Sequence, residues 1–312
     1  MGQFVISIDF EKYWGMRDHK SINDYKKNLE RVDFINEALL AIFKKYEIHC
    51  TWAFVGFLIH ENKEDLLKEI PIKTPSYKNE TLSPYNYIRI NKLVEKFHFA
   101  PSSIRKIVSS KNQELASHTY SHYYCLEDGQ TKEEFKIDIE KHIKITKNRY
   151  EIDLQSLVLP RNQINEKYIK VIKESGIKYF RGNEVNWIYN IKINILKRFF
   201  RLLDCYINIS GSNTYKVKEI KKNFPYNIPS SRFLRPVSEK KSILKRLKLR
   251  RIKKQMTYAA KKDELFHLWW HPHNFGNDVK GNMLFLEEIF KHFLDLKKKH
   301  NMKSLNMSEF DG

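Results

Sequence analysis

The stretch Glu114-Leu115-Ala116-Ser117-His118-Thr119-Tyr120-Ser121-His122 governs how the rest of the chain is interpreted. A short apolar run, typical of a β-strand, ends here in two imidazoles four residues apart. A tight loop or one turn of helix would bring both rings to one point, and neutral imidazoles are good ligands for a divalent metal. Taken alone, this spacing also fits a chance pair of histidines on a solvated turn.

Two further apolar runs also end in groups that can do chemistry. Residues 4–8 precede Asp9 and Glu11, and residues 265–270 precede His271-Pro272-His273. In a parallel α/β barrel the carboxyl ends of the strands meet at one edge. Asp9 and Glu11 leave the same face if the strand continues, so one could bind a cation while the other takes a proton from water. Glu11 as the first solvated loop residue is the alternative.

Apolar runs alternate with helical patterns along much of the chain. The predicted strands are 4–8, 49–58, 156–159, 177–181, 265–270 and 303–307, and the predicted helices are 21–46, 131–150, 165–175 and 283–299. Such alternation implies right-handed parallel crossovers, hence a barrel or an open doubly wound sheet. We predict an α/β fold, namely a distorted or incomplete (β/α) barrel of seven to eight strands with a long basic insertion.

The length of 312 residues with 41% hydrophobic composition suits one domain covering residues 1–312. Two segments without a steady pattern are predicted as insertions, at about 71–101 and 182–262. The first is rich in Pro, Tyr and Asn, and loops of that length in compact domains tend to be functional. The second is polar, Asn-rich and basic.

The net charge of +20 favours an acidic partner, such as an anionic membrane surface, a phosphate-bearing substrate or nucleic acid. A compositional bias toward Lys, Ile and Asn is the alternative. The charge is concentrated between Lys240 and Lys254, where Ile243, Leu244, Leu247 and Ile252 recur at roughly helical intervals and Leu249 falls off the stripe. We predict that this basic insertion contacts an anionic membrane, with residues 195–203 as a shorter second candidate. A solvated surface helix or a contact to nucleic acid is the alternative.

Three cysteines, Cys50, Cys125 and Cys205, are an odd number without framework spacing, which fits a reducing compartment. The first residues lack a basic stretch and run directly into the first strand, so a signal peptide is not expected. Together these features predict a cytoplasmic protein, with a peripheral position at the inner face of the membrane if the basic insertion binds there.

The strand-end motifs together resemble those of the polysaccharide deacetylase family, the NodB-homology domain of carbohydrate esterase family four, especially members from surface-polysaccharide gene clusters. Residues 117–122 match the family's H-[ST]-x-x-H motif, which supplies two metal ligands. Asp9-Phe10-Glu11 departs from the family's Asp-Asp motif. By position the resemblance makes Asp9 the base and Glu11 the metal ligand beside His118 and His122, although the two acids could exchange roles. The implied cofactor is a divalent metal, zinc first, with cobalt or iron as alternatives.

The later motifs of the family are only partly present. Pro160-Arg161 keeps part of the third, which makes Arg161 a candidate to orient the base. Residues 181–183 and Trp187 echo the fourth. Leu268-Trp269-Trp270-His271 resembles the fifth, and His271 is preferred to His273 as the general acid because the apolar run stops there.

Several residues near these motifs are candidates for substrate contact. Trp14, Tyr123 and Tyr124, together with Tyr13, could stack on a sugar ring or simply pack, and Asn162 is placed beside Arg161. The backbone N–H of Tyr123 or Tyr124 is a candidate for an oxyanion hole.

The resemblance implies a metal-dependent hydrolase that removes an N-acetyl group from a sugar or a lipid-linked glycan during surface polysaccharide biosynthesis. Two alternatives remain at this point: cleavage of another C–N bond, as in cyclic amides or formamides, on the same scaffold, or a degenerate domain that binds sugar or nucleic acid without catalysis.

Overall fold

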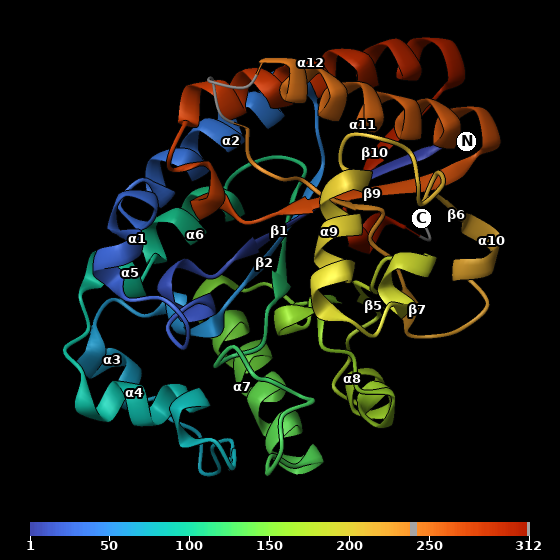
Figure 1. Cartoon of the computed structure of the whole chain (residues 1–312). Coiled ribbons are helices and arrows are strands. Elements are labelled where there is room, and N and C mark those ends of the chain that lie inside the picture. Colours follow the sequence, from blue (N-terminus) through green and yellow to red (C-terminus); the bar gives the residue numbers. More distant parts are fainter. Residues whose placement is uncertain (238–241, 311–312) are drawn as a thin grey trace.

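The computed structural model describes residues 1–237 and 242–310 as one curled sheet wrapped by helices (Figure 1). Its strand order is β6-β9-β1-β2-β3-β4-β5-β7, with β10 also paired to β1 and β8 to β9. Every pair among the described strands is parallel except β6 with β9. Parallel pairing throughout the centre of the sheet is what the alternation of strands and helices predicts.

The strands are β1 Gln3–Phe10, β2 Cys50–Phe54, β3 Gln113–Ser117, β4 Ser156–Leu157, β5 Tyr179–Phe180, β6 Tyr215–Lys216, β7 Tyr226–Asn227, β8 Arg232–Phe233, β9 Glu264–Trp270 and β10 Lys303–Leu305. The helices are α1 Ile22–Leu29, α2 Val32–Tyr46, α3 Lys63–Leu67, α4 Pro84–Ile90, α5 Glu95–His98, α6 Pro101–Val108, α7 Lys132–Tyr150, α8 Ile169–Glu174, α9 Asn194–Asp204, α10 Val217–Ile220, α11 Ser242–Lys262 and α12 Val279–His300. Short 3-10 helices lie between them, among them η1 Lys12–Gly15, η2 Gly56–Ile59, η4 Pro160–Asn162, η6 Trp187–Asn190, η7 Pro272–Phe275 and η8 Met307–Glu309.

The segment that runs from β7 to β8 curls the sheet toward closure. On one side the Ile228 N–H donates to the Phe180 carbonyl at 2.9 Å, and on the other the Leu234 N–H donates to the Trp269 carbonyl at 2.8 Å. One continuous piece of chain therefore contacts both β5 and β9. The predicted distorted (β/α) barrel is confirmed.

The first strand shows how the barrel is filled. Alternate side chains of a strand point to opposite faces. Phe4, Ile6 and Ile8 pack in the large core between sheet and helices, whereas Val5 packs in the smaller cluster with Ala53 and other inward-facing residues. This alternation assigns Ser7 and Asp9 to the face of Val5, so a carboxylate lies at the inner end of the strand.

The strand register brings the residues that follow the strands to one edge. Phe10 pairs with Phe54, and Phe54 with Ser117. On the other side of β1, Ile8 pairs with Trp270. Glu11 and His118 are therefore the first residues beyond β1 and β3, and His271 lies level with Asp9. The predicted gathering of these groups at the carboxyl edge follows directly from the register.

Tertiary contacts shorten two predicted elements. The helix predicted over 21–46 is divided into α1 and α2, because Asn28 and Arg31 donate to the His273 and Gly276 carbonyls of the turn after β9, at 2.7 and 2.9 Å. The strand predicted over 49–58 ends at Phe54. The next residues form η2, whose Gly56 N–H donates to the Thr119 carbonyl at 3.0 Å.

Other predicted boundaries agree with the structure. Ser21 caps α1, and Thr131 with Glu134 forms a complete capping box at the start of α7. Gly176, with φ of +85°, follows α8 in the left-handed position that glycine adopts at little cost.

The two segments predicted as insertions contain structure of their own. Residues 71–101 include short helices, and Tyr85, Ile88 and Leu93 of this segment join the large core. Residues 182–262 include α9 and α11. They also include the short strands β7 and β8, and these two strands were not predicted from the sequence. The organisation of the chain as a single domain with insertions stays a prediction.

The basic stretch from Lys240 to Lys254 packs differently from the predicted membrane-facing helix. Lys240 and Lys241 lie outside the described residues. Further along, α11 lies side by side with α12 (Figure 1) and directs Ile252 and Met256 into the large core. Ile252, one of the apolar residues predicted to face the membrane, is thus buried in the core. Leu249, which does not share their helical spacing, also packs against the core.

Cys50, Cys125 and Cys205 are all buried and free. Among the described residues, none of the helices combines the length and the apolar composition needed to span a bilayer.

Candidate active site

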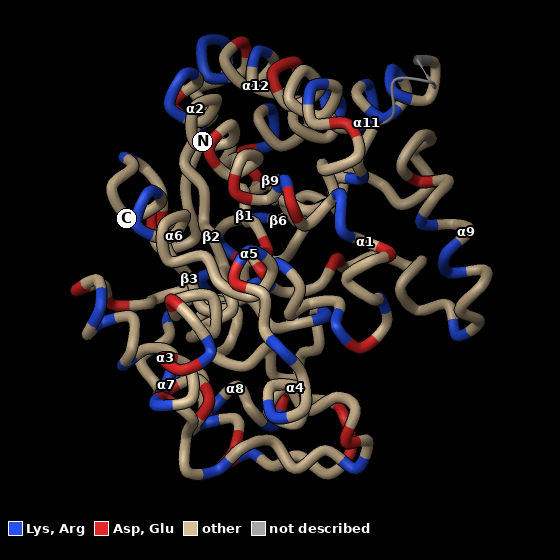
Figure 2. Tube along the Cα trace, turned by 90° about the vertical axis from the view of Figure 1, so that its left-hand side faces the viewer, with Lys and Arg blue, Asp and Glu red and all other residues tan. Residues whose placement is uncertain are grey.

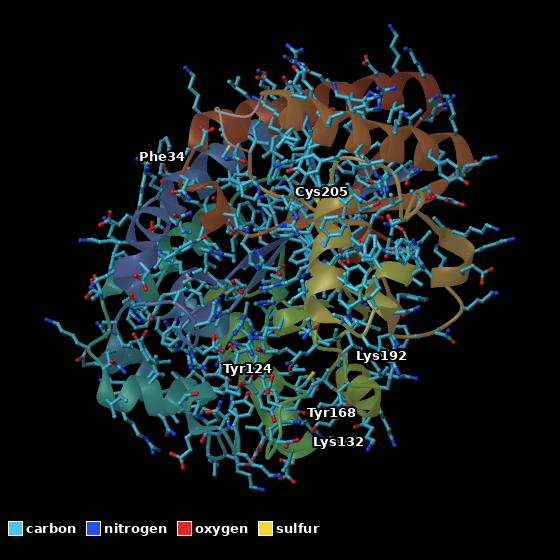
Figure 3. All side chains as sticks on the ribbon, in the orientation of Figure 1. Phe34, Tyr124, Lys132, Tyr168, Lys192 and Cys205 are labelled. Atoms are coloured by element: carbon cyan, nitrogen blue, oxygen red, sulfur yellow. The ribbon has the colours of Figure 1, made fainter. Side chains whose placement is uncertain are left out.

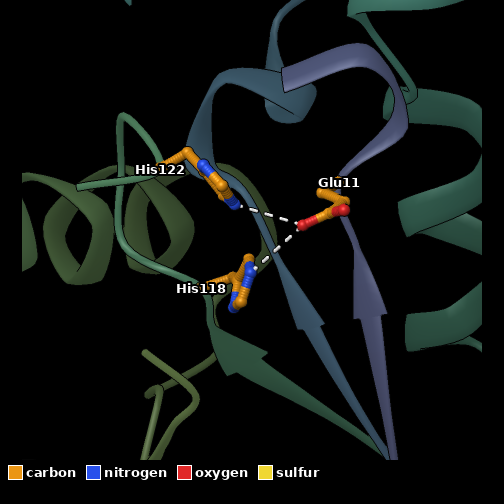
Figure 4. Close-up of side chains that lie close together, drawn as sticks. All are labelled: Glu11, His118 and His122. Carbon is orange, nitrogen blue, oxygen red and sulfur yellow. Dashed lines mark hydrogen bonds and ion pairs between the residues drawn. The ribbon is translucent and has the colours of Figure 1, made fainter. Parts of the chain in front are cut away.

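Three side chains converge at the carboxyl edge of the sheet (Figure 4). Glu11 Oε2 lies 3.1 Å from His122 Nε2 and 3.4 Å from His118 Nε2, and all three residues are buried. His118 directly follows β3. A tight loop, in which Thr119 and His122 have positive φ, then returns His122 to the same point. The predicted convergence of the two imidazoles on Glu11 is therefore present in the structure.

Hydrogen bonds on the far side of each ring fix which nitrogen faces Glu11. His118 Nδ1 lies 2.8 Å from the Val158 carbonyl, which can only accept, so Nδ1 carries the proton and Nε2 keeps its lone pair. His122 Nδ1 lies 3.2 Å from the Tyr124 hydroxyl, which itself lies 3.3 Å from Asp18 Oδ2. Burial lowers the pKa of His122 to about 4 despite the nearby Glu11 carboxylate, so this ring is neutral at pH 7.

This group of atoms fits a divalent cation. The nitrogen His118 Nε2 is buried and has no hydrogen-bond partner within the part of the chain that the structure describes, which is costly unless something else occupies its lone pair. Glu11, His118 and His122 each offer one ligand atom, and these atoms lie within 4.8 Å of one another. Two imidazoles and one carboxylate form a ligand set typical of open catalytic zinc sites.

Arg181, the first residue after β5, holds the carboxylate of Asp9. Arg181 Nη1 donates to Asp9 Oδ1 at 2.6 Å, and Arg181 Nη2 donates to Oδ2 at 2.8 Å. The same guanidinium donates to Ser7 Oγ at 3.0 Å and lies 4.2 Å from the Trp269 ring centroid. A two-pronged contact of this kind fixes the orientation of the carboxylate as well as its charge.

Both acids are held in the ionised form. Burial alone would raise the pKa of Asp9, but the charge of Arg181 and its hydrogen bonds outweigh burial and lower it. Burial would likewise raise the pKa of Glu11, whereas the neighbouring His271, His118 and His122 together hold it well below its usual range.

His271 is the histidine of the 271–273 pair that faces the acids. Its Nε2 lies 3.6 Å from Asp9 Oδ2 and 3.5 Å from Glu11 Oε1, and its side chain is 21% exposed. His273 is buried behind it, stacked at 5.0 Å between ring centroids, and burial lowers its pKa to about 3. The geometry thus favours His271 as the group that both contacts the acids and reaches solvent.

Comparison with known proteins was made for the whole chain. The family model described as "Polysaccharide deacetylase" matches residues 31–180. Residues 31–180, just under half of the chain, therefore resemble a polysaccharide deacetylase domain. The matched segment contains His118 and His122, while Asp9, Glu11, Arg181 and His271 lie outside it. A comparison with curated proteins found no match.

One solved structure shares the fold, and two others align more loosely. A candidate polysaccharide deacetylase from Mycobacterium smegmatis aligns with a TM-score of 0.54 and 11% identity, over 99% of this chain and 88% of that one. The peptidoglycan deacetylase PdaC from Bacillus subtilis aligns over 99% and 90% with 9% identity and a TM-score of 0.41. A family-four pseudoenzyme from Bacillus anthracis aligns over 99% and 65% with 11% identity and a TM-score of 0.43.

Arg161 does not take the place that the deacetylase resemblance suggested. Its guanidinium forms an ion pair with Asp18, lies 3.7 Å from Glu127 Oε1 and stacks at 4.1 Å on the Tyr124 ring. Arg161 directly follows Pro160 on η4 and has a φ of 55°. Arg181 contacts Asp9 instead.

Sequence reasoning noticed Arg181 only as an echo of the fourth motif. Two signals were available: Arg181 is the last residue of the predicted strand 177–181, and in a barrel the carboxyl ends of the strands line the site. The strand has only two residues in the structure, so the pattern there was weak.

The residues proposed for sugar stacking have other partners. Trp14 is fully buried, and its Nε1 donates to the His98 carbonyl at 2.6 Å. Tyr123 and Tyr124 are also fully buried. Their backbone N–H groups donate to Thr119 Oγ1 and the Tyr77 hydroxyl, at 2.7 and 2.8 Å, so neither N–H is free for an oxyanion.

Two of the predicted substrate residues support the site from behind instead. Tyr124 contacts His122, as described above. Asn162 Oδ1 accepts from Arg181 Nη2 at 2.8 Å, so Asn162 helps to hold the arginine that holds Asp9. These contacts make both residues positioning residues.

The loop between the two histidines rests on a buried carboxylate of α7. Asp138 Oδ1 accepts from the Tyr120 N–H at 2.7 Å, and Oδ2 accepts from the Ser121 N–H at 3.2 Å and from the Ser121 hydroxyl. Sequence reasoning did not single out Asp138, because its spacing to the motif carries no signal.

Proposed function

We propose that the protein is a metal-dependent hydrolase that removes the N-acetyl group from a sugar or glycan. The match of residues 31–180 to the polysaccharide deacetylase family model supports deacetylase activity. The observation that carries the proposal is the convergence of five side chains. Glu11 lies within 3.5 Å of His118, His122 and His271, and His271 lies 3.6 Å from Asp9.

Glu11, His118 and His122 would hold the cation, zinc in the first instance. A bound divalent cation supplies Lewis acidity toward the acetyl carbonyl. The chain's contribution is to keep both imidazoles neutral and aimed by the contacts of His118 with Val158 and of His122 with Tyr124. Partners of this kind, behind the ligands, set ligand orientation and basicity.

Asp9 is the proposed general base. Arg181 orients Asp9 and keeps it ionised. Asp9 shares the neighbour His271 with the proposed cation ligand Glu11. It takes a proton from the attacking water. His271, which contacts both acids and is partly open to solvent, delivers a proton to the departing amine nitrogen. The contacts of the two acids support this division of roles. Arg181 contacts Asp9, the proposed base, whereas His118 and His122 contact Glu11, the proposed cation ligand.

The proposed substrate is an N-acetylated glycan intermediate of surface polysaccharide biosynthesis, handled in the cytoplasm. The resemblance to deacetylases of such gene clusters supports the pathway, and the net charge of +20 favours a substrate that carries phosphate, such as a lipid-linked sugar.

The test combines metal content with deacetylation of an N-acetylated oligosaccharide. The protein as purified should contain about one divalent cation, and His118→Ala or His122→Ala should lose both the cation and the activity, because each removes one of three protein ligands. His300→Ala, at the far end of α12, is the matched control and should keep both.

Amide variants separate the two acids. Asp9→Asn should keep the cation and lose most of the rate, whereas Glu11→Gln should lose the cation. The proposal fails if either His118→Ala or His122→Ala turns over substrate at the wild-type rate with full metal content.

A further inference from the structure

The segment around α9 exposes an unusual amount of apolar surface. Of the twenty large apolar side chains that are exposed among the described residues, eight lie between residues 185 and 207. They are Val185, Trp187, Ile193, Ile195, Leu196, Phe199, Leu202 and Ile207. A contiguous apolar patch on a protein surface marks an interaction site more often than chance exposure does.

α9 is an amphipathic helix whose apolar face is exposed and whose polar face is turned toward the protein. At helical spacing, Ile195, Phe199 and Leu202 share one face, and they are 78%, 56% and 46% exposed. The polar side is turned inward: Asp204 is the buried residue of the helix, and the Arg201 guanidinium lies 5.1 Å from the Tyr189 ring. A surface helix normally buries its apolar stripe and exposes its charges.

The helix is held in this orientation by buried ion pairs at its end. Asp204 Oδ2 accepts from Arg232 Nη2 at 2.6 Å, and Asp204 Oδ1 accepts from Arg251 Nη2 at 3.3 Å. Breaking a buried pair leaves an uncompensated charge, so turning the apolar face inward would be costly. Figure 2 shows α9 standing out at the right-hand edge, and Figure 3 labels Lys192 and Cys205 just before and just after it.

We propose that α9 with η6 docks on an anionic phospholipid bilayer, with the apolar face of the helix buried among the acyl chains and headgroups. The charge pattern selects this occupant. Residues 185–203 contain no Asp or Glu, and besides the inward-facing Arg201 they carry Lys192, Lys197 and Arg198. Cations beside a buried apolar face, with Trp at the boundary, are what an interfacial helix requires.

A second copy of the chain fits this surface less well. A two-fold dimer would place the same patch against itself, so the cations of one copy would face those of the other without acidic partners. A bilayer with anionic headgroups satisfies both the apolar face and the charges.

The docking surface lies close to the candidate site. Arg232, which holds Asp204, is followed along β8 by Phe233, whose ring centroid lies 5.8 Å from that of His271. Docking through α9 would therefore hold the mouth of the site near the bilayer. If the proposed deacetylase function holds, on which this step rests, the acetylated sugar is presented by a lipid anchor in that bilayer.

The test is co-sedimentation with vesicles of phosphatidylglycerol and phosphatidylcholine, and with vesicles of phosphatidylcholine alone. Wild type should bind the anionic vesicles and release them at high salt. A variant with Ile195→Ser, Phe199→Ser and Leu202→Ser should bind at least tenfold more weakly. The matched control, Phe34→Ser, Ile72→Ser and Ile90→Ser, removes three apolar side chains elsewhere that are at least as exposed and should bind like wild type.

Tryptophan fluorescence gives a second readout. Trp187 is 48% exposed, whereas the other four tryptophans are buried, so its emission should shift to the blue on anionic vesicles and this shift should vanish in Trp187→Phe. His118→Ala should bind vesicles like wild type, which separates docking from catalysis.

Three results would overturn the proposal. The first is no binding of wild type to anionic vesicles, and the second is equal loss in the α9 variant and the control. The third is a wild-type dimer in solution that the α9 variant dissociates while vesicles bind neither protein, which would assign the patch to a second copy.

Discussion

At the scale of single residues, the carboxylate of Asp9 owes its position to Arg181. The guanidinium touches both carboxylate oxygens and is itself held by Ser7 and Asn162. A lysine would keep the charge and lose the two-pronged geometry.

Arg181→Lys should therefore lower kcat for deacetylation by about 10- to 100-fold, the range measured for partners behind site residues. Metal content should stay the same, since the cation ligands do not touch Arg181. Arg161→Lys is the matched control and should change kcat much less. A larger loss in Arg161→Lys than in Arg181→Lys would show that the orienting role had been assigned to the wrong arginine.

At the scale of elements, the two-histidine loop is held against η2. The Gly56 and Phe57 N–H groups donate to the Thr119 and Tyr120 carbonyls, each at 3.0 Å. A Cβ on Gly56 would lie 2.8 Å from the Tyr120 Cα, which is closer than atoms in folded proteins pack.

Gly56→Ala should push the loop away from η2 and lower the free energy of unfolding by about 1–3 kcal/mol, as overpacking in a tight core does. Because His118 and His122 bracket the displaced residue, metal affinity should also fall. Thermal unfolding with and without added zinc measures both effects. An unchanged melting temperature together with unchanged metal affinity would contradict this account of the loop.

The elements also show how far the sequence could be used for prediction. The pairing of His118 with His122, and the i, i+2 relation of Asp9 and Glu11, are local, so spacing and strand ends were enough to select them. The neighbours of Arg161 and Trp14 depend on where η4 and α5 fold back, which no local pattern encodes. β7 and β8 have two residues each, too few for periodicity to reveal.

At the scale of the whole molecule, two buried histidines make the fold sensitive to acid. Burial lowers the pKa of His60 to about 4; the nearby Asp65 carboxylate acts against this shift, and the charge of Arg149 adds to it. Burial also lowers the pKa of His98 to about 4. An unfolded histidine titrates near pH 6.5. Between pH 6.5 and 4 the unfolded chain therefore binds protons that the folded chain does not, so stability falls as the pH falls through this window.

Each histidine should contribute up to about 3 kcal/mol of this loss. The measurement is chemical denaturation at several pH values from 7.5 to 4. His98→Gln should flatten the dependence between pH 6.5 and 4, while His300→Gln should leave it as in wild type. An identical slope in His98→Gln and wild type would remove His98 from the explanation.

The position of β1 in the middle of the sheet has a consequence for synthesis on the ribosome. β1 is made first, and its partner β9 begins only at residue 264. Until then β1, whose Phe4, Ile6 and Ile8 face the large core, has β2 on one side and an open edge on the other. An exposed, unpaired edge of this kind is prone to pair with other chains. During synthesis this edge of β1 therefore stays available for pairing with other chains until residues 264–270 have emerged.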